Sequence, residues 1–387
     1  MIRYFIFLIF FLFGSSGSLR AQHIVLVTND EFRPVAQQAL DSLYNRNPEA
    51  ADKIFEPWRE KYPDHPVWLL WEGMEQWWIV LEDLDNKSHD DEFYDKMKRA
   101  DFQAGRFLSN NPRHPDGLIV RAAANGYLAR HQSNREEWMS SLNHGRLAYQ
   151  SQQAMKKILP DFADNLIAEG IIKYYSAYLP EAYPFMKTMA WFLPSGDKEE
   201  GLRLLERAAK ESLFAGPEAL YFLGFIRLNY EENFDEAVED FQKLVTRYPN
   251  NSFYRRLFVR SLFQMGKYDL AFKEIEKAIA HWENNDYPLL NIMKEELMYW
   301  RGRIHLKNNR LQQAFFAFED AFRYGENLAN SQQRTYRTLG GFYAGYSAEK
   351  LNNIQKATEY YEAVASMDGN NEVKKRAKEQ VNNFNQK

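Results

Sequence analysis

The amino-acid sequence predicts an all-α fold, a right-handed solenoid of about seven to eight helix–turn–helix pairs followed by a C-terminal capping helix. Three observations lead to this prediction. A small residue followed by larger apolar residues at offsets of 4 and 7 recurs along most of the chain. Prolines follow several copies of this pattern at a fixed distance. Signals for β-strands are nearly absent, and HIVLVT at 23–28 is the one run with β character.

The repeat is clearest where Ala237 and Ala271 lie 34 residues apart, each with an aromatic residue three positions earlier. Offsets of 4 and 7 keep the patterned residues on one helical face, which predicts a packed face. The proline stands twelve residues after the anchor in three copies and ends the helix. The anchors are Ala51, Ala100, Gly201, Ala237, Ala271, Ala314 and Ala357, and the prolines are Pro63, Pro112 and Pro249.

This pattern resembles the tetratricopeptide repeat, a helix–turn–helix unit of about 34 residues with a W-x2-L-G-x2-Y…A-x3-F…P pattern. Gly224, Gly302 and Gly345 match the glycine of the first helix, where a small residue lets the two helices approach, and Phe258 takes that place in one copy. The resemblance is good for 216–368, fair for 34–112 and poor for 115–180. It implies an interaction protein with a concave binding groove.

Each element follows from this spacing. Helix pairs are expected near 34–63, 66–112, 115–158, 160–213, 217–249, 251–283, 289–325 and 331–366. We expect one continuous solenoid, because no Gly/Ser-rich linker interrupts the chain. The 34-residue pattern favours an open superhelix over a closed barrel. The expected organisation is a signal peptide at 1–21, an N-terminal extension at 22–33, divergent repeats at 34–213, typical repeats at 214–368 and a capping helix at 369–387.

The stretch WLLWEGMEQWWIVLED at 68–83 contains four of the nine tryptophans. On a helical wheel Trp71, Trp77 and Trp78 fall within a wide apolar arc and are predicted to be core residues. Trp68 falls among the glutamates and is the one candidate for an exposed contact. The stretch is too charged and too short to cross a membrane.

The N-terminus predicts export. FIFLIFFLF follows a basic start and precedes small residues, which predicts a signal peptide cleaved near Ala21 and a periplasmic or secreted mature chain without a transmembrane helix. A retained anchor is the alternative. The chain has no cysteine, which excludes disulfides and lipid attachment at a cysteine and favours a bacterial periplasm. A net charge of −4 with dispersed Lys and Arg gives no footprint for nucleic acid.

Motifs for catalysis are missing from the sequence. It contains no H-E-x-x-H pair and no phosphate-binding glycine loop, so we expect neither an enzyme nor a bound metal or other cofactor. The cluster from His89 to Glu92 is expected to be a helix N-terminus with an aspartate cap. The enzyme alternative is an α-helical hydrolase, an α/α-barrel glycosidase with two facing carboxylates at the mouth of a closed barrel.

A partner-binding surface is predicted on the concave groove of the first helices. Positions three before and one after the glycine share a face distinct from the packed one. The resulting candidates, with Trp68, are Tyr221, Phe225, Arg255, Tyr299, Arg303, Phe342 and Tyr346. Packing between repeats is the alternative role for at least half of them.

The function expected from these features is an exported scaffold that binds a protein or peptide partner in cell-envelope assembly or maintenance. A helical-repeat glycan-binding protein is the alternative, because tyrosine and tryptophan side chains stack on sugar rings. Exposed tryptophan would favour the glycan alternative, and a pocket with perturbed carboxylates would favour the hydrolase.

Overall fold

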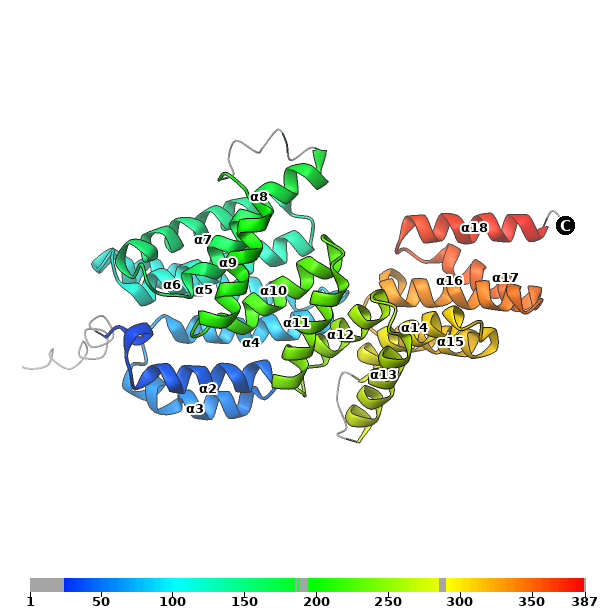
Figure 1. Ribbon diagram of the computed structural model, residues 1–387, viewed down its shortest axis with the longest axis horizontal. Helices are drawn as coiled ribbons and strands as arrows, with labels where there is room; N and C mark the ends of the chain where they lie inside the picture. The colour runs from blue at the N-terminus through cyan, green and yellow to red at the C-terminus, as the bar shows by residue number, and fades with distance from the viewer. Residues whose placement is uncertain (1–23, 185–186, 188–193, 285–289, 386–387) are drawn as a thin grey trace, which may run out of the picture.

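The computed structural model describes residues 24–184, 187, 194–284 and 290–385. These residues form seventeen α-helices and two 3-10 helices, and they contain no β-strand (Figure 1). Successive helices pair antiparallel and stack along the chain, so the all-α solenoid is confirmed. The predicted signal peptide and its cleavage site at Ala21 lie outside the described residues.

Eight helix pairs and a final helix make up the solenoid. The pairs are α2 (Phe32–Tyr44) with α3 (Pro48–Lys61), α4 (Val67–Glu82) with α5 (Asp90–Asn110), α6 (Pro115–Asn134) with α7 (Trp138–Ile158), α8 (Asn165–Ala182) with α9 (Lys198–Glu211), α10 (Gly216–Asn229) with α11 (Phe234–Arg247), α12 (Ser252–Gln264) with α13 (Tyr268–Glu283), α14 (Leu290–Lys307) with α15 (Leu311–Glu326), and α16 (Thr335–Lys350) with α17 (Ile354–Ser366). The final helix is α18 (Asn371–Asn385), and the 3-10 helices are η1 (Leu26–Thr28) and η3 (Ser331–Gln333).

Within a pair, the glycine of the first helix contacts the aromatic ring of the second. A Cβ atom added to Gly224 would lie 2.9 Å from the Phe241 ring, and one added to Gly302 would lie 2.6 Å from the Phe318 ring. The anchor alanines Ala237 and Ala314 are fully buried beside these rings. Glycine is therefore required by close helix packing, as the sequence predicted.

In the sixth pair, α12 with α13, the large side chain lies on the first helix and the smaller one on the second. Phe258 occupies the glycine position of α12, and Ile275 replaces the aromatic residue of α13. Both side chains are buried in the same core cluster. A large residue on one helix thus coincides with a smaller one on the other, which conserves core volume.

The turns within pairs share one conformation. A residue in the left-handed region follows the first helix in six pairs, a common way to end a helix. The second pair and the fourth pair have no such residue in the described part of their connections. These six residues are Arg46, Glu136, Glu232, Gly266, Asn309 and Asn352.

The β-like run at 23–28 forms no strand over its described part. Leu26–Thr28 forms η1. The backbone N–H groups of Leu26 and Val27 donate to the two carboxylate oxygens of Asp116, at 2.6 and 2.9 Å. These donors are satisfied by a side chain of α6, so the segment needs no strand partner.

The tryptophans of α4 form the centre of the N-terminal half. Trp71, Trp77 and Trp78 are buried, which confirms their prediction as core residues. Trp78 packs edge-on against Tyr44 of α2 and Tyr254 of α12, with ring centroids 5.6 and 5.5 Å away. α4 is therefore covered by helices of the first pair and of the sixth pair.

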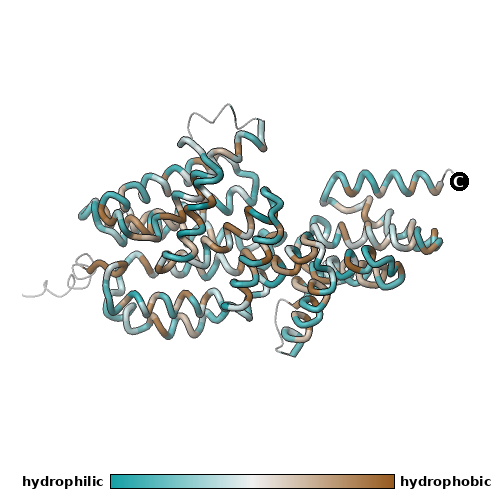
Figure 2. Tube along the Cα trace, in the orientation of Figure 1, coloured by the Kyte–Doolittle hydropathy of each residue, from teal (hydrophilic) through white to brown (hydrophobic). Residues whose placement is uncertain are grey.

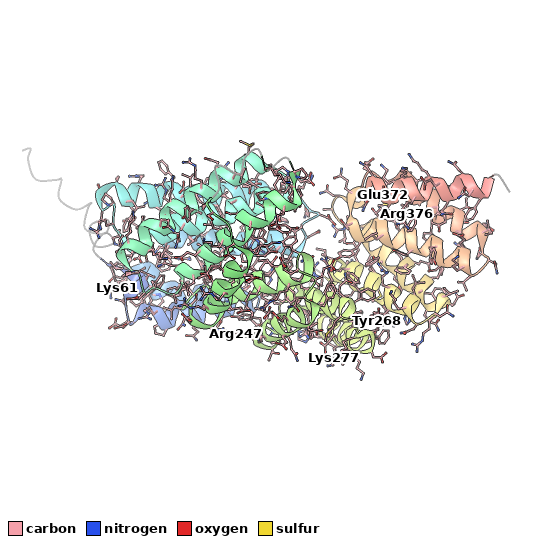
Figure 3. All side chains as sticks on the ribbon, turned by 45° about the horizontal axis from the view of Figure 1, so that its top comes forward. Lys61, Arg247, Tyr268, Lys277, Glu372 and Arg376 are labelled. Carbon is pink, nitrogen blue, oxygen red and sulfur yellow. The ribbon has the colours of Figure 1, made fainter. Side chains whose placement is uncertain are left out.

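The superhelix also closes locally through bonds between helix pairs that are distant in sequence. Arg247 of α11 bonds Asp41 of α2 at 2.8 Å, and Arg334 before α16 bonds Asp83 after α4 at 2.9 Å. Figure 3 labels Arg247, which lies where α11 borders the first pair. The repeat pattern specifies packing between neighbouring pairs, whereas side-chain bonds between distant pairs set this closure.

The two ends of the molecule differ. The first pairs wrap around α4, while α14 to α18 form a separate arm that ends at the C-terminus (Figure 1). α18 is mostly hydrophilic, as Figure 2 shows, and it packs on α17. Arg376 of α18 lies 4.7 Å from the ring of Phe342 on α16 (Figure 3).

Candidate binding cavity on the concave face

A large cavity lies on the concave side of the solenoid. Its volume is about 1460 Å³, and its walls come mainly from the first helices of the pairs, together with α7. Cavities of this size with mainly apolar walls are the usual ligand sites of proteins. The concave side, which the repeat pattern predicted as the binding face, therefore contains a large cavity with mainly apolar walls.

Aromatic side chains line the N-terminal part of this cavity. Tyr221, Phe222 and Phe225 enter from α10, and Tyr175 enters from α8. Burial raises the pKa of Tyr175 well above its ordinary value, so its hydroxyl stays protonated. Such walls combine broad apolar contact with hydroxyl groups that hydrogen-bond a ligand.

An ion pair between a half-buried arginine and a buried glutamate lies beside the aromatic part. The Arg130 guanidinium of α6 lies 4.8 Å from the ring of Trp77 and 4.4 Å from that of Tyr221. It bonds the Glu218 carboxylate of α10 at 3.3 Å. The hydroxyl of Tyr127 also donates to Glu218, at 3.4 Å. These groups join α4, α6 and α10 below the apolar walls.

A second charged network lines the other part of the cavity, between the N-terminal half and the C-terminal arm. Arg334 donates to Glu295 from Nη2 at 2.7 Å and to Asp83 from Nη1 at 2.9 Å. Arg256 bonds Glu296 at 3.1 Å and the backbone carbonyl of Glu82 at 2.9 Å. All five side chains are buried.

One carboxylate of this network has a perturbed pKa. Burial raises the pKa of Glu295 to about 7, and the Arg334 guanidinium counteracts that rise. A raised carboxylate pKa in a pocket was the feature expected of a hydrolase. Glu295 is held by two bonds from Arg334, however, so its environment is that of an ion pair linking helices. Among the described residues no group of three or more His, Cys, Asp or Glu is placed to hold a metal ion.

The acidic turn at the start of α5 has a different role from the predicted cap. No side chain caps this helix. Asp90 instead bonds Arg135 at 2.6 Å and His131 at 2.9 Å, both from α6 and the turn after it. The aspartate therefore fastens the second pair to the third.

Two of the candidate residues predicted from the sequence line the cavity. Tyr221 and Phe225 are both on its wall. Arg255 instead bonds Glu274 of its own pair at 2.7 Å, and Arg303 bonds the Tyr299 hydroxyl at 2.6 Å. The remaining candidates lie elsewhere on the first helices, with Phe342 buried and Tyr346 half-buried.

The prediction of Trp68 as an exposed contact was wrong. Its side chain is 4% exposed, and its indole N–H donates to the Tyr62 carbonyl at 2.7 Å. Phe32 and Phe55 of the first pair pack against its ring. The glutamate side of α4 is thus covered near its start by α2 and α3, which a single-helix wheel cannot show. Six of the eight described tryptophans are buried, and Trp58 and Trp138 are half-buried.

Sequence reasoning missed Arg130, Glu218 and Tyr175. Arg130 and Tyr175 lie in 115–180, where the repeat match was too poor to assign a register. Glu218 lies in a well-matched pair, at a position the groove rule did not select. A charged residue within the apolar pattern of α10 was the available signal.

The comparisons agree with this architecture. A family model of the tetratricopeptide repeat matches residues 218–251, which contain most of α10 and all of α11. A comparison with curated protein sequences finds no match. The match identifies one tetratricopeptide repeat, and the other pairs share its helix–turn–helix arrangement. This fold indicates a protein-interaction scaffold.

Several solved structures are similar at low identity. PilW, a widely conserved type IV pilus biogenesis factor, is 15% identical, with 63% of this chain and 92% of that one covered and a TM-score of 0.40. A tetratricopeptide repeat protein from Parabacteroides merdae is 15% identical over 79% and 99%, with a TM-score of 0.43. Human IFIT1 in a dimer with m7Gppp-AAAA is 12% identical over 94% and 87%, with a TM-score of 0.46. Because each TM-score is below 0.5, we infer nothing about function from these structures.

Proposed function

We propose that this chain is an exported scaffold that binds a segment of a protein partner in its concave cavity and acts in the assembly or maintenance of a cell envelope. The observation that carries the binding proposal is the cavity of about 1460 Å³ with aromatic walls from successive first helices. Rigid aromatic side chains supply most of the binding energy in many peptide sites. A non-enzymatic role fits the engagement of the cavity carboxylates with arginines.

Binding can be tested with the mature chain, residues 22–387, and an unbiased library of displayed peptides. Recovered peptides should lose about tenfold in affinity, or about 1.4 kcal/mol, when Phe225→Ala removes a ring from the cavity wall. Phe316→Ala is the matched control, because Phe316 of α15 is 53% exposed and does not line the cavity. Peptides that bind both variants equally well, or a library without binders, would contradict the proposal.

A parallel assay addresses the glycan alternative. The same proteins are titrated with oligosaccharides while tryptophan fluorescence is recorded. Since none of the described tryptophans is fully exposed, we expect no saturable change. A change that Phe225→Ala abolishes would favour glycan binding over peptide binding.

Export is supported by the signal-like N-terminus. None of the described helices combines the length and apolar character that a membrane crossing needs. Fractionation of native cells followed by N-terminal sequencing should recover a chain that begins near Gln22 in an extracytoplasmic fraction. Recovery of the intact N-terminus from the cytoplasm would contradict the export proposal.

A further inference from the structure

The stack of helix pairs is interrupted between the third and the fourth pair. α6 packs extensively on α7, and α8 packs extensively on α9, but α8 makes few contacts with α7. Several second helices, such as α5 and α15, pack closely on the first helix that follows them, whereas α3 and α13, like α7, make few backbone contacts with theirs. The side of α8 that faces α7 therefore buries little of the surface that a helix pair in a solenoid normally buries, while α9 packs on α10.

α10 closes the floor of this interruption. The Arg130 guanidinium of α6 lies 4.4 and 5.1 Å from the rings of Tyr221 and Phe222 on α10. The third and fifth pairs thus meet directly, and Ile171 and Tyr175 of α8 pack in the same hydrophobic cluster as Phe222 of α10. The resulting part of the cavity, here called the α7–α8 slot, is lined by Gly126, Leu142, Gly145, Ile171, Tyr175 and Phe225.

The two facing walls of the slot differ in the size of their side chains. The wall from α8 presents large apolar side chains, among them Ile171 and Tyr175, which are only half-buried. The opposite wall includes several glycine and alanine residues between larger side chains such as Leu142. A Cβ atom added to Gly126 would meet no atom within 4 Å, and one added to Gly145 would meet only the Ala129 Cβ, at 4.0 Å. Unlike Gly224 and Gly302, these glycines face open space instead of a packed ring.

Most charged groups around the slot have partners, and the Asp164 carboxylate before α8 accepts from the backbone N–H groups of residues 213–215. The cavity-lining residues within α8 are all uncharged. On the opposite wall Arg130 is paired with Glu218, and Arg146 donates only to the Asn143 amide oxygen among the bonds that the described residues form. An occupant that carries carboxylates beside its apolar surface would therefore find a cation at the rim.

We propose that the α7–α8 slot binds one amphipathic α-helix of a protein partner, with acidic side chains beside its apolar stripe. The slot continues the helix-on-helix interface of the neighbouring pairs, and the element missing from that interface is a helix. The small residues of α6 and α7 let a helix backbone approach closely, while the α8 side chains pack into its grooves. This inference rests on the proposed function and names the class of partner segment.

The test fills the slot without disturbing the fold. Gly126→Leu places a larger side chain in open space within a helix, where leucine is also the better helix former. Gly105→Leu is the matched control, because a Cβ at Gly105 of α5 also meets no atom within 4 Å and Gly105 does not line the cavity. We expect Gly126→Leu to weaken the recovered library peptides at least about tenfold and Gly105→Leu to leave their affinity unchanged.

A second arm tests the conformation of the bound peptide. The recovered peptides are remade with a central proline, which breaks a helix, and binding is followed by fluorescence anisotropy and circular dichroism. We expect the original peptides to gain helix on binding, to carry net negative charge and to lose at least about tenfold in affinity with the proline.

Each other outcome has a distinct meaning. Peptides that tolerate both the proline and Gly126→Leu, but respond to Phe225→Ala, would overturn this inference and leave the proposed function standing. A library without binders would remove the proposed function itself. If a fluorescent fatty acid binds the parent protein but not Gly126→Leu, and peptide affinity is the same for both, the occupant of the slot would be an acyl chain and not a helix. A lower melting temperature for Gly126→Leu than for Gly105→Leu would show that the slot is not open space.

Discussion

Gly302 shows how one missing side chain sets the distance between two helices. A Cβ atom there would lie 2.6 Å from the fully buried Phe318 ring, which has no space to move. We expect Gly302→Ala to destabilise the protein by about 1–3 kcal/mol through overpacking. Gly105→Ala, at an open helical position, should stabilise it by about 1 kcal/mol. Urea unfolding of both variants checks this, and equal effects would contradict it.

Glu75 makes stability depend on pH. Burial and the nearby charge of Asp52 raise the pKa of this carboxyl to about 7. The folded state therefore holds the proton more tightly than the unfolded chain. The stabilisation is fully present below about pH 4.5 and is lost as the pH rises through about 7.

Glu75→Gln removes this titration. Between pH 5 and pH 8 the parent protein loses the stabilisation from Glu75, and the variant does not. The difference in unfolding free energy, variant minus parent, should therefore be higher at pH 8 than at pH 5 by on the order of 1 kcal/mol, after allowance for solvent screening. Urea unfolding at the two pH values measures the difference. A parallel shift of parent and variant would mean that Glu75 ionises normally in the folded protein.

Individual residues were predictable from the sequence where one contact determines their role. Gly224, Gly302 and Gly345 were assigned by pattern, and each faces the expected ring. Trp68 was not predictable, because its burial depends on how the first pair covers α4. A helical wheel shows which residues share a face of one helix. It cannot show which residues of a neighbouring pair cover that face.

At the scale of elements, α4 separates structural from exposed apolar residues. Trp77 is fully buried against Phe93 and Tyr127, whereas Ile79 of the same helix is 40% exposed. We expect Trp77→Ala to cost about 3–5 kcal/mol and Ile79→Ala to cost about 0.5 kcal/mol or less. Thermal and urea unfolding distinguish the two. A small effect for Trp77 would mean that the N-terminal pairs do not share one core.

The helices themselves were predicted well, because the 4 and 7 offsets report a packed face directly. All eight predicted pairs correspond to observed pairs. The cavity wall formed by α6, α7 and α8 was not predicted in detail. This region lacks the regular stacking that produces the repeat pattern, so the same interruption that forms the slot also weakens its sequence signal.

At the scale of the whole molecule, the repeat pattern could not predict the closure of the superhelix. Asp41, Glu82 and Asp83 bond residues roughly 200 positions away in sequence, and no period encodes such pairs. The closure matters for function, because it brings α12, α14 and α16 to the same cavity as α2 and α4. The binding site is therefore a property of the closed superhelix.

Arg334 offers the sharpest test of that closure. It is 2% exposed and bonds Glu295 of the arm and Asp83 of the N-terminal half. Arg334→Met keeps most of the volume but leaves two buried carboxylates without their cation, so we expect a loss of about 3–5 kcal/mol at pH 8. Arg247→Met breaks another bond between distant pairs, but that ion pair is 58% and 44% exposed, so its loss should cost no more than about 1 kcal/mol. Urea unfolding measures both losses, and hydrogen exchange should show faster opening around Asp83 in Arg334→Met alone. Similar small losses in the two variants would mean that the contacts between the α4 and α12 side chains, and not the buried ion pairs, hold the superhelix closed.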